Sequence, residues 1–159
     1  MATSSDPTVS DELFPGLTGC YACGRDNPHA LGVVGSVDGD EIVATWTPRP
    51  HHEGWPGLVH GGVVATLLDE VTGWAATRAF RVRDGDHDDR PVVTAEYTVR
   101  FERPVRAGDE VEIRARVVEH GDRKALVEGE VVAGSEIAAT CSAVYVRLRA
   151  QPDWAASPT

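Results

Sequence analysis

The segment from Val63 to Ala76 is apolar on nearly every side of a helix, yet it carries two adjacent acids, Asp69 and Glu70, at its middle. A helix that is apolar all round is buried, so we expect the rest of the chain to wrap around it. An unpaired charge in such surroundings costs several kcal/mol unless it reaches solvent, finds a partner or takes up a proton. A shielded carboxylate is also the group that acyl-transfer chemistry uses as a nucleophile or base. The segment therefore has a structural and a catalytic interpretation.

Length and charge exclude several classes of protein. The 159 residues suffice for one domain with a single core. With 15 Lys and Arg against 25 Asp and Glu, the net charge of -10 argues against a nucleic-acid partner, and any anionic ligand needs a local basic patch. No run approaches the roughly 18 apolar residues of a membrane span, and the N-terminus lacks the pattern of a signal peptide. We therefore expect a soluble, cytoplasmic protein that does not bind membranes.

Five runs alternate between apolar and polar residues, a pattern typical of half-buried strands. They cover residues 41–46, 92–101, 110–119, 124–132 and 137–148. The last run has unusually small residues at its middle, which suits a strand with something bulky packed across it. A long helix followed by consecutive antiparallel strands predicts an α+β domain. We place this domain at residues 18–149, between a flexible tail at 1–17 and another at 150–159.

Cys20 and Cys23 form a single Cys-x-x-Cys pair ahead of the domain. One such pair supplies two of the four ligands that structural zinc takes, and His29 would make a third. The favoured interpretation is a turn packed by small thiols, with no metal bound. Three cysteines in the chain do not make a disulfide framework.

His60, Gly61 and Gly62 stand where the helix would begin. A helix start presents unpaired N–H groups and a partial positive charge. Because glycine has no Cβ, these N–H groups can contact a carbonyl oxygen, which outlines an oxyanion hole. Asp69 follows His60 by nine residues, about two turns into the helix. A glycine-rich helix cap with a satisfied buried acid explains this spacing equally well.

Four motifs occur together in this chain: Gly54-Trp55-Pro56-Gly57, His60-Gly61-Gly62-x6-Asp69, Val93-Thr94-Ala95, and Arg100-Phe101-x-Arg103-Pro104-Val105. Together they resemble the hotdog-fold acyl-CoA thioesterases, in the branch of phenylacetate-pathway and mitochondrial thioesterase-superfamily proteins. The resemblance covers roughly residues 20–149. It is fairly specific for the superfamily and poorly specific for the substrate.

The resemblance implies one hotdog domain, a long central helix wrapped by a five- or six-stranded antiparallel sheet. It implies that Asp69 is the nucleophile or general base and that the Gly61 N–H polarises the thioester carbonyl. His60 helps to fix the loop and the thioester, and Gly62 is a substrate-binding candidate. Thr94, contributed in such dimers by the facing chain, positions the attacking water. Adjacent helix residues point about 100° apart, so only one of the two acids can face the site, and the spacing favours Asp69 over Glu70.

Coenzyme A brings phosphate groups that an acidic protein can hold only where the charge is locally reversed. Seven of the basic residues lie between positions 100 and 124, interspersed with acids, so an ordinary charged strand surface explains most of them. Arg123 and Lys124, after a Gly-Asp turn, are the best candidates for binding the phosphates, followed by Arg103.

The function that we expect from the sequence is hydrolysis of an acyl-CoA to a free acid and CoA, with no metal or organic cofactor. The resemblance implies a homodimer or a dimer of dimers with sites between subunits. Two alternatives stay open: a hotdog-fold hydratase or dehydratase acting on acyl thioesters, and a non-catalytic acyl-CoA-binding protein. The hydratase motifs are absent, since no Asp-x4-His lies near His60 and Glu70 follows Pro56-Gly57 by thirteen residues.

Overall fold

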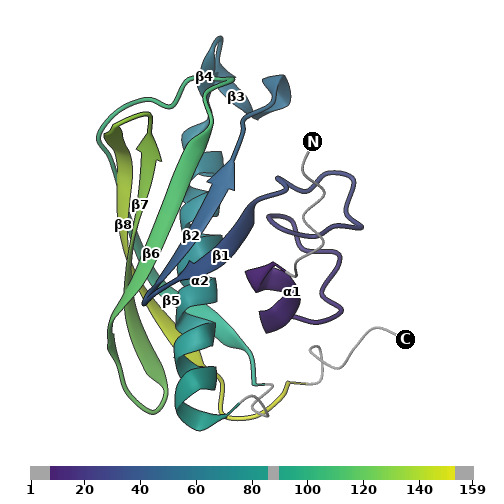
Figure 1. Cartoon of the computed structure of the whole chain (residues 1–159), viewed down its shortest axis with the longest axis vertical. Helices are drawn as coiled ribbons and strands as arrows, with labels where there is room; N and C mark the ends of the chain where they lie inside the picture. Colours follow the sequence, from purple (N-terminus) through teal and green to yellow (C-terminus); the bar gives the residue numbers. More distant parts are fainter. Residues whose placement is uncertain (1–7, 86–89, 153–159) are drawn as a thin grey trace.

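A long helix lies between an antiparallel sheet and the N-terminal segment in the computed structural model, which describes residues 8–85 and 90–152. The helix is α2 (Gly61–Asp84), and the sheet has six strands in the order β1-β2-β6-β7-β8-β5. Figure 1 shows α2 in teal at the centre, with the sheet curving around one side and α1 (Val9–Leu13) on the other. This confirms the predicted α+β architecture.

The sheet strands are β1 (Val34–Asp38), β2 (Glu41–Trp46), β5 (Val92–Phe101), β6 (Val111–His120), β7 (Lys124–Ala133) and β8 (Glu136–Arg147). All five strands that the sequence predicts are present, with ends that differ by no more than one residue. The alternation failed to identify β1, which pairs with β2. A second, two-stranded sheet of β3 (Glu53–Trp55) and β4 (Leu58–Val59) follows a short 3-10 helix (Pro50–His52) and leads into α2.

Small residues on the inner face of the sheet let α2 approach closely. A Cβ added at Gly129 of β7 would lie 2.7 Å from the Thr72 side chain and 3.1 Å from the Cys141 sulfur. Ala139, Cys141 and Ala143 of β8 are buried on the same side. The small run in β8 therefore does face a bulky element, and that element is α2.

The helix is not buried all round. Within the segment 63–76 that the sequence predicts to be buried, Val63, Thr66, Asp69 and Glu70 are only half-buried. The expectation of complete burial was wrong because a sheet covers only one side of a helix, and the N-terminal segment covers only part of the other. No helix among the described residues is long and apolar enough to cross a lipid bilayer.

The N-terminal segment contributes a short helix where the sequence predicts a tail. Thr8 caps α1, since its Oγ1 accepts the Asp11 N–H at 3.2 Å while an Asp11 carboxylate oxygen accepts the Thr8 N–H at 3.3 Å. Val9 and Leu13 are buried against the core. Residues 1–7 and 153–159 of the two predicted tails lie outside the described residues.

Candidate active site

The start of α2 presents one unused backbone donor. His60 is the N-cap, and its Nδ1 accepts the N–H of Gly62 at 2.9 Å, so the Gly62 donor is occupied. The N–H of Gly61 has no acceptor among the described residues. Of the two predicted donors, Gly61 is therefore the one that can bind a ligand oxygen, and it lies at the positive end of the helix dipole.

A largely apolar hollow of about 320 Å³ adjoins this donor. Its lining comes from the end of β4, the start of α2, the end of β5 and the turn after β5. The lining residues are Val59, Gly61, Val64, Phe101, Glu102, Arg103, Pro104 and Val105. The structure thus brings Gly61 and Arg103 to one hollow. Arg103 is exposed and forms an ion pair with Glu136 at 3.0 Å.

Asp69 lies two turns further along α2, where two hydroxyl groups hold its carboxylate. Thr94 Oγ1 donates to Asp69 Oδ1 at 2.8 Å, and the Tyr145 hydroxyl donates to the same oxygen at 3.0 Å. Among the described residues, Oδ2 accepts no hydrogen bond. Two donors on Oδ1 fix the orientation of the carboxylate and leave Oδ2 for a reacting atom.

Thr94 reaches Asp69 within a single chain, whereas the resemblance implied a threonine from the facing chain. The register between β5 and β8 shifts between Thr94 and Glu96. Such irregularities turn a side chain out of the regular alternation of a strand. Thr94 therefore contacts Asp69 of its own chain, and the contribution of a threonine by the facing chain stays a prediction.

Tyr145 was missed in the sequence. It is 2% exposed, and its hydroxyl lies 2.8 Å from Thr72 Oγ1. Its single proton is shared between two acceptors on Asp69, the carboxylate Oδ1 at 3.0 Å and the carbonyl oxygen at 2.7 Å. Burial, followed by the charge of Asp69, raises the pKa of Tyr145, so the phenol stays protonated and acts as a donor. The sequence does contain a signal for Tyr145. It is a large residue with a polar hydroxyl at the end of β8, whose other inward-facing residues are small. It also stands opposite Thr94 in the pairing of β5 with β8.

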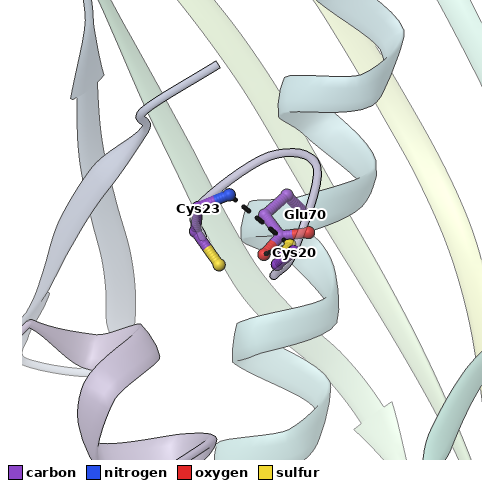
Figure 2. Close-up of side chains that lie close together, drawn as sticks. All are labelled: Cys20, Cys23 and Glu70. Atoms are coloured by element: carbon purple, nitrogen blue, oxygen red, sulfur yellow. Dashed lines mark hydrogen bonds between the residues drawn. The ribbon is translucent and has the colours of Figure 1, made fainter. Parts of the chain in front are cut away.

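Glu70 points to a different part of the molecule. Its Oε1 accepts hydrogen bonds from Trp74 Nε1 at 3.0 Å and from Cys20 Sγ at 3.5 Å. Figure 2 shows its carboxylate directed at the loop that carries Cys20 and Cys23. Burial raises the pKa of Glu70 to about 7. The two acids thus point to different surroundings, since among the described residues Asp69 alone contacts Thr94 and Tyr145. The choice of Asp69 as the acid of the site stays a prediction.

The comparison with known proteins gives the family. Residues 56–139 match the thioesterase superfamily. This chain belongs to that superfamily. An acyl-coenzyme A thioesterase of Xenopus laevis is 28% identical over 109 residues, which span 67% of this chain and 45% of that protein. The chain therefore corresponds to less than half the length of this relative.

Solved structures of thioesterase-superfamily proteins share the fold. A phenylacetic acid degradation-related protein of Ralstonia eutropha superposes with a TM-score of 0.70 at 24% identity, covering 88% of this chain and 99% of that one. A variant of the phenylacetic acid degradation protein PaaI from Thermus thermophilus gives a TM-score of 0.63 at 28% identity, covering 74% and 95%. These matches confirm the hotdog fold and the branch that the motifs indicated.

The predicted coenzyme A contacts of this thioesterase-superfamily chain do not gather in one subunit. Arg123 donates from Nε to the Arg147 carbonyl at 3.4 Å, and Lys124 begins β7 on the exposed face. The preceding residue, Asp122, forms an ion pair with Arg83 near the end of α2. Arg123 and Lys124 therefore lie at the opposite end of the helix from Gly61, and their role stays a prediction.

Other basic residues of the sheet surface are neutralised locally. Arg114 pairs with Glu112 at 2.7 Å, and Arg116 pairs with Glu128 at 2.7 Å. Both arginines line a hollow of about 480 Å³ on the outer face of the sheet. Because acids alternate with bases there, this face has the character of an ordinary charged strand surface.

Proposed function

We propose that this protein hydrolyses an acyl-CoA thioester to a free acid and CoA. The observation that carries the proposal is the Asp69 carboxylate, oriented through one oxygen by Thr94 and Tyr145, on the same helix that presents the unpaired Gly61 N–H to an apolar hollow. Membership of the thioesterase superfamily and the similarity to an acyl-coenzyme A thioesterase support it.

In this proposal the Gly61 N–H binds the thioester carbonyl oxygen and stabilises the negative charge that develops there. The free oxygen of Asp69 either attacks the carbonyl carbon, forming a mixed anhydride that water then cleaves, or takes a proton from the attacking water. CoA leaves as the thiolate in both routes. His60 keeps its Nδ1 on the Gly62 N–H and so holds the helix start in shape. The chemistry needs neither a metal nor an organic cofactor.

One chain cannot assemble this site by itself. Gly61 and Asp69 are eight residues apart on a single helix, which separates them by about 12 Å along its axis. A thioester carbonyl needs its oxygen within about 3 Å of the donor and its carbon about 3–3.5 Å from the attacking atom. The site therefore has to combine Gly61 of one chain with Asp69 of another.

Strand β5 provides the means of combining two chains. It is an edge strand, paired only with β8, so a second chain can add its own β5 along the open edge. In a two-fold antiparallel pairing, the Thr94 end of one strand meets the Phe101 end of the other. Thr94 contacts Asp69, and a Cβ at Gly61 would lie 3.6 Å from the Phe101 ring. The pairing thus moves Gly61 of one chain towards Asp69 of the other.

The same two-fold pairing affects the predicted phosphate contacts. It brings the end of the sheet that carries Arg123 and Lys124 towards the Arg103 end of the facing chain. We therefore propose that these three basic residues surround one bound coenzyme A only in the dimer, with two sites per pair of chains.

Release of free thiol from a panel of short, long and aromatic acyl-CoAs tests the proposed function. The wild type is expected to release CoA from at least one class well above the rate in buffer, and Asp69→Asn is expected to lose that rate. Thioester binding without release by the wild type on every substrate would mean a non-catalytic binding protein. Full activity in Asp69→Asn would refute the site assignment.

A further inference from the structure

Three potential metal ligands converge on the side of α2 that faces away from Thr94 and Tyr145. The ligand atoms of Cys20, Cys23 and Glu70 all lie within 4.8 Å of one another (Figure 2). The Cys20 sulfur is 3.5 Å from Glu70 Oε1. All three side chains are partly buried, between the N-terminal segment and the helix. The proposed hydrolysis does not use this cluster.

The loop that carries the two cysteines is shaped around the Cys20 sulfur. The Cys23 N–H donates to Cys20 Sγ at 3.4 Å, and the Gly24 N–H donates to the Cys20 carbonyl at 2.9 Å. A Cβ at Gly24 would lie only 2.4 Å from that carbonyl oxygen, so this turn requires glycine. Asn27 closes the loop by donating from Nδ2 to the carbonyls of Gly19 and Cys20. The backbone thus holds both thiols on the same side of the turn.

The donor set and its spacing suit zinc. A tetrahedral zinc ion, with bonds of about 2.3 Å to sulfur and about 2.0–2.2 Å to a carboxylate oxygen, holds these atoms roughly 3.5–4 Å apart. The distance from Cys20 to Glu70 already falls in this range. Thiolate ligands select zinc over magnesium and calcium, which take oxygen ligands. Two thiolates and one carboxylate supply three of the four ligands, and a water can complete the set because the cluster is only partly buried.

We propose that Cys20, Cys23 and Glu70 form a zinc site that fastens the N-terminal segment to α2. The third protein ligand is thus Glu70, and not His29, which the sequence offered; His29 is exposed, and the cluster does not include it. Three protein ligands and a water are the ligand set of catalytic zinc sites. We nevertheless assign the ion a structural role, because Glu70 faces away from the groups that contact Asp69. By fixing the residue next to Asp69, the ion also fixes the rotation of α2 about its axis.

Zinc content and cobalt spectroscopy of the whole chain test this proposal. Protein purified in a thiol-free reductant and then freed of metal with a chelator is expected to take up about one zinc ion per chain, measured by elemental analysis after dialysis. Titration with Co²⁺ is expected to give the intense visible bands of a tetrahedral site and a charge-transfer band from thiolate to metal. Bound zinc is also expected to raise the midpoint of thermal unfolding, because the ion binds the folded chain.

Matched variants identify the ligands. Cys20→Ser, Cys23→Ser and Glu70→Gln are each expected to lose most of the bound metal and the zinc-dependent rise in the unfolding midpoint. Two controls are expected to retain both: Cys141→Ser, which alters the third cysteine in β8, and Asp69→Asn, which alters the adjacent acid. Circular dichroism of each variant at low temperature checks that it is folded.

Two results would overturn the proposal. One is a wild-type protein whose cobalt spectrum lacks thiolate ligation, or whose Cys20 and Cys23 form a disulfide that persists in reductant. The other is metal uptake that Cys141→Ser reduces as much as Cys20→Ser does. Thioesterase activity is not the readout, so failure of the zinc site and failure of the proposed function are distinguishable.

Discussion

Two inactive variants of this chain are expected to restore activity to each other when they are combined. Gly61→Pro removes the proposed oxyanion donor, and Asp69→Asn removes the proposed nucleophile or base. Because these groups are about 12 Å apart on one helix, the proposed dimer places Gly61 of one chain and Asp69 of the other in each site. A mixed dimer then contains one site with both groups intact and one site with neither.

The proline substitution is chosen to delete an N–H group with little change in the fold. Gly61 is the first residue of α2, a position where proline is favoured because no intrahelical hydrogen bond is lost. The preceding residue, His60, has φ -61° and ψ 132°, which is the conformation that proline imposes on its predecessor. Loss of one oxyanion donor lowers kcat by about 10²–10³-fold. Gly61→Ala, which keeps the donor, is expected to lose less.

The size of the rescue follows from counting sites. Loss of a general base or nucleophile at Asp69 lowers kcat by about 10²–10⁴-fold, so both homodimers are nearly inactive. Random exchange of subunits makes half of the dimers mixed, and each of these has one intact site of two, giving about a quarter of the wild-type rate. The assay is CoA release after the two variants are co-refolded in equal amounts, with each variant refolded alone as the control. Co-refolded protein that forms mixed dimers but stays as inactive as its parents would refute the shared site.

Further predictions concern single residues. Tyr145→Phe removes one charge-assisted hydrogen bond to Asp69, worth about 1.5–3 kcal/mol, so we expect kcat for CoA release to fall about 10- to 100-fold with little change in KM; an unchanged kcat would exclude a positioning role. Burial, followed by the charges of His51 and Arg49, lowers the pKa of His52, whose Nδ1 accepts the Arg49 N–H at 2.9 Å. The stability contributed by neutral His52 is therefore fully present above the ordinary pKa of 6.5. It is lost as the pH falls from 6.5 through the lower pKa of the folded state. Urea unfolding over this pH range should show a steeper loss of unfolding free energy in the wild type than in His52→Phe. Gly129→Ala places a methyl group 2.7 Å from a side-chain carbon of α2, so the free energy of unfolding should fall by about 1–3 kcal/mol, and an unchanged urea midpoint would contradict this packing.

The elements with strong periodicity could be predicted from the sequence. The run at residues 92–101 alternates over its whole length, and β5 occupies the same residues. By contrast, β1 contains three polar or glycine positions among its five residues, and four of the five are exposed, so it shows no clear alternation. Its existence depends on pairing with β2, which is a tertiary interaction. The helix α1 is only five residues long and is stabilised by its cap and by the burial of Val9 and Leu13, neither of which gives a periodic signal.

The residues of the candidate site also differ in how far the sequence predicts them. Gly61 and Asp69 belong to one local motif, so sequence spacing sufficed to place them on one helix. Tyr145 follows Asp69 by 76 residues, and only the register of β8 against β5 and the curvature of the sheet bring its hydroxyl to the carboxylate. Glu70 meets Cys20 across 50 residues of chain, so sequence proximity to the two cysteines offers His29 and gives no sign of Glu70.

The central claim is that Asp69, and not its neighbour Glu70, performs the chemistry. Its most direct test is kcat/KM for CoA release by Asp69→Asn and Glu70→Gln, measured side by side on the best acyl-CoA substrate of the wild type, with zinc present. We expect Asp69→Asn to fall by about 10²–10⁴-fold and Glu70→Gln to remain far more active than that. Equal losses in the two variants, or the larger loss in Glu70→Gln, would contradict the assignment of Asp69.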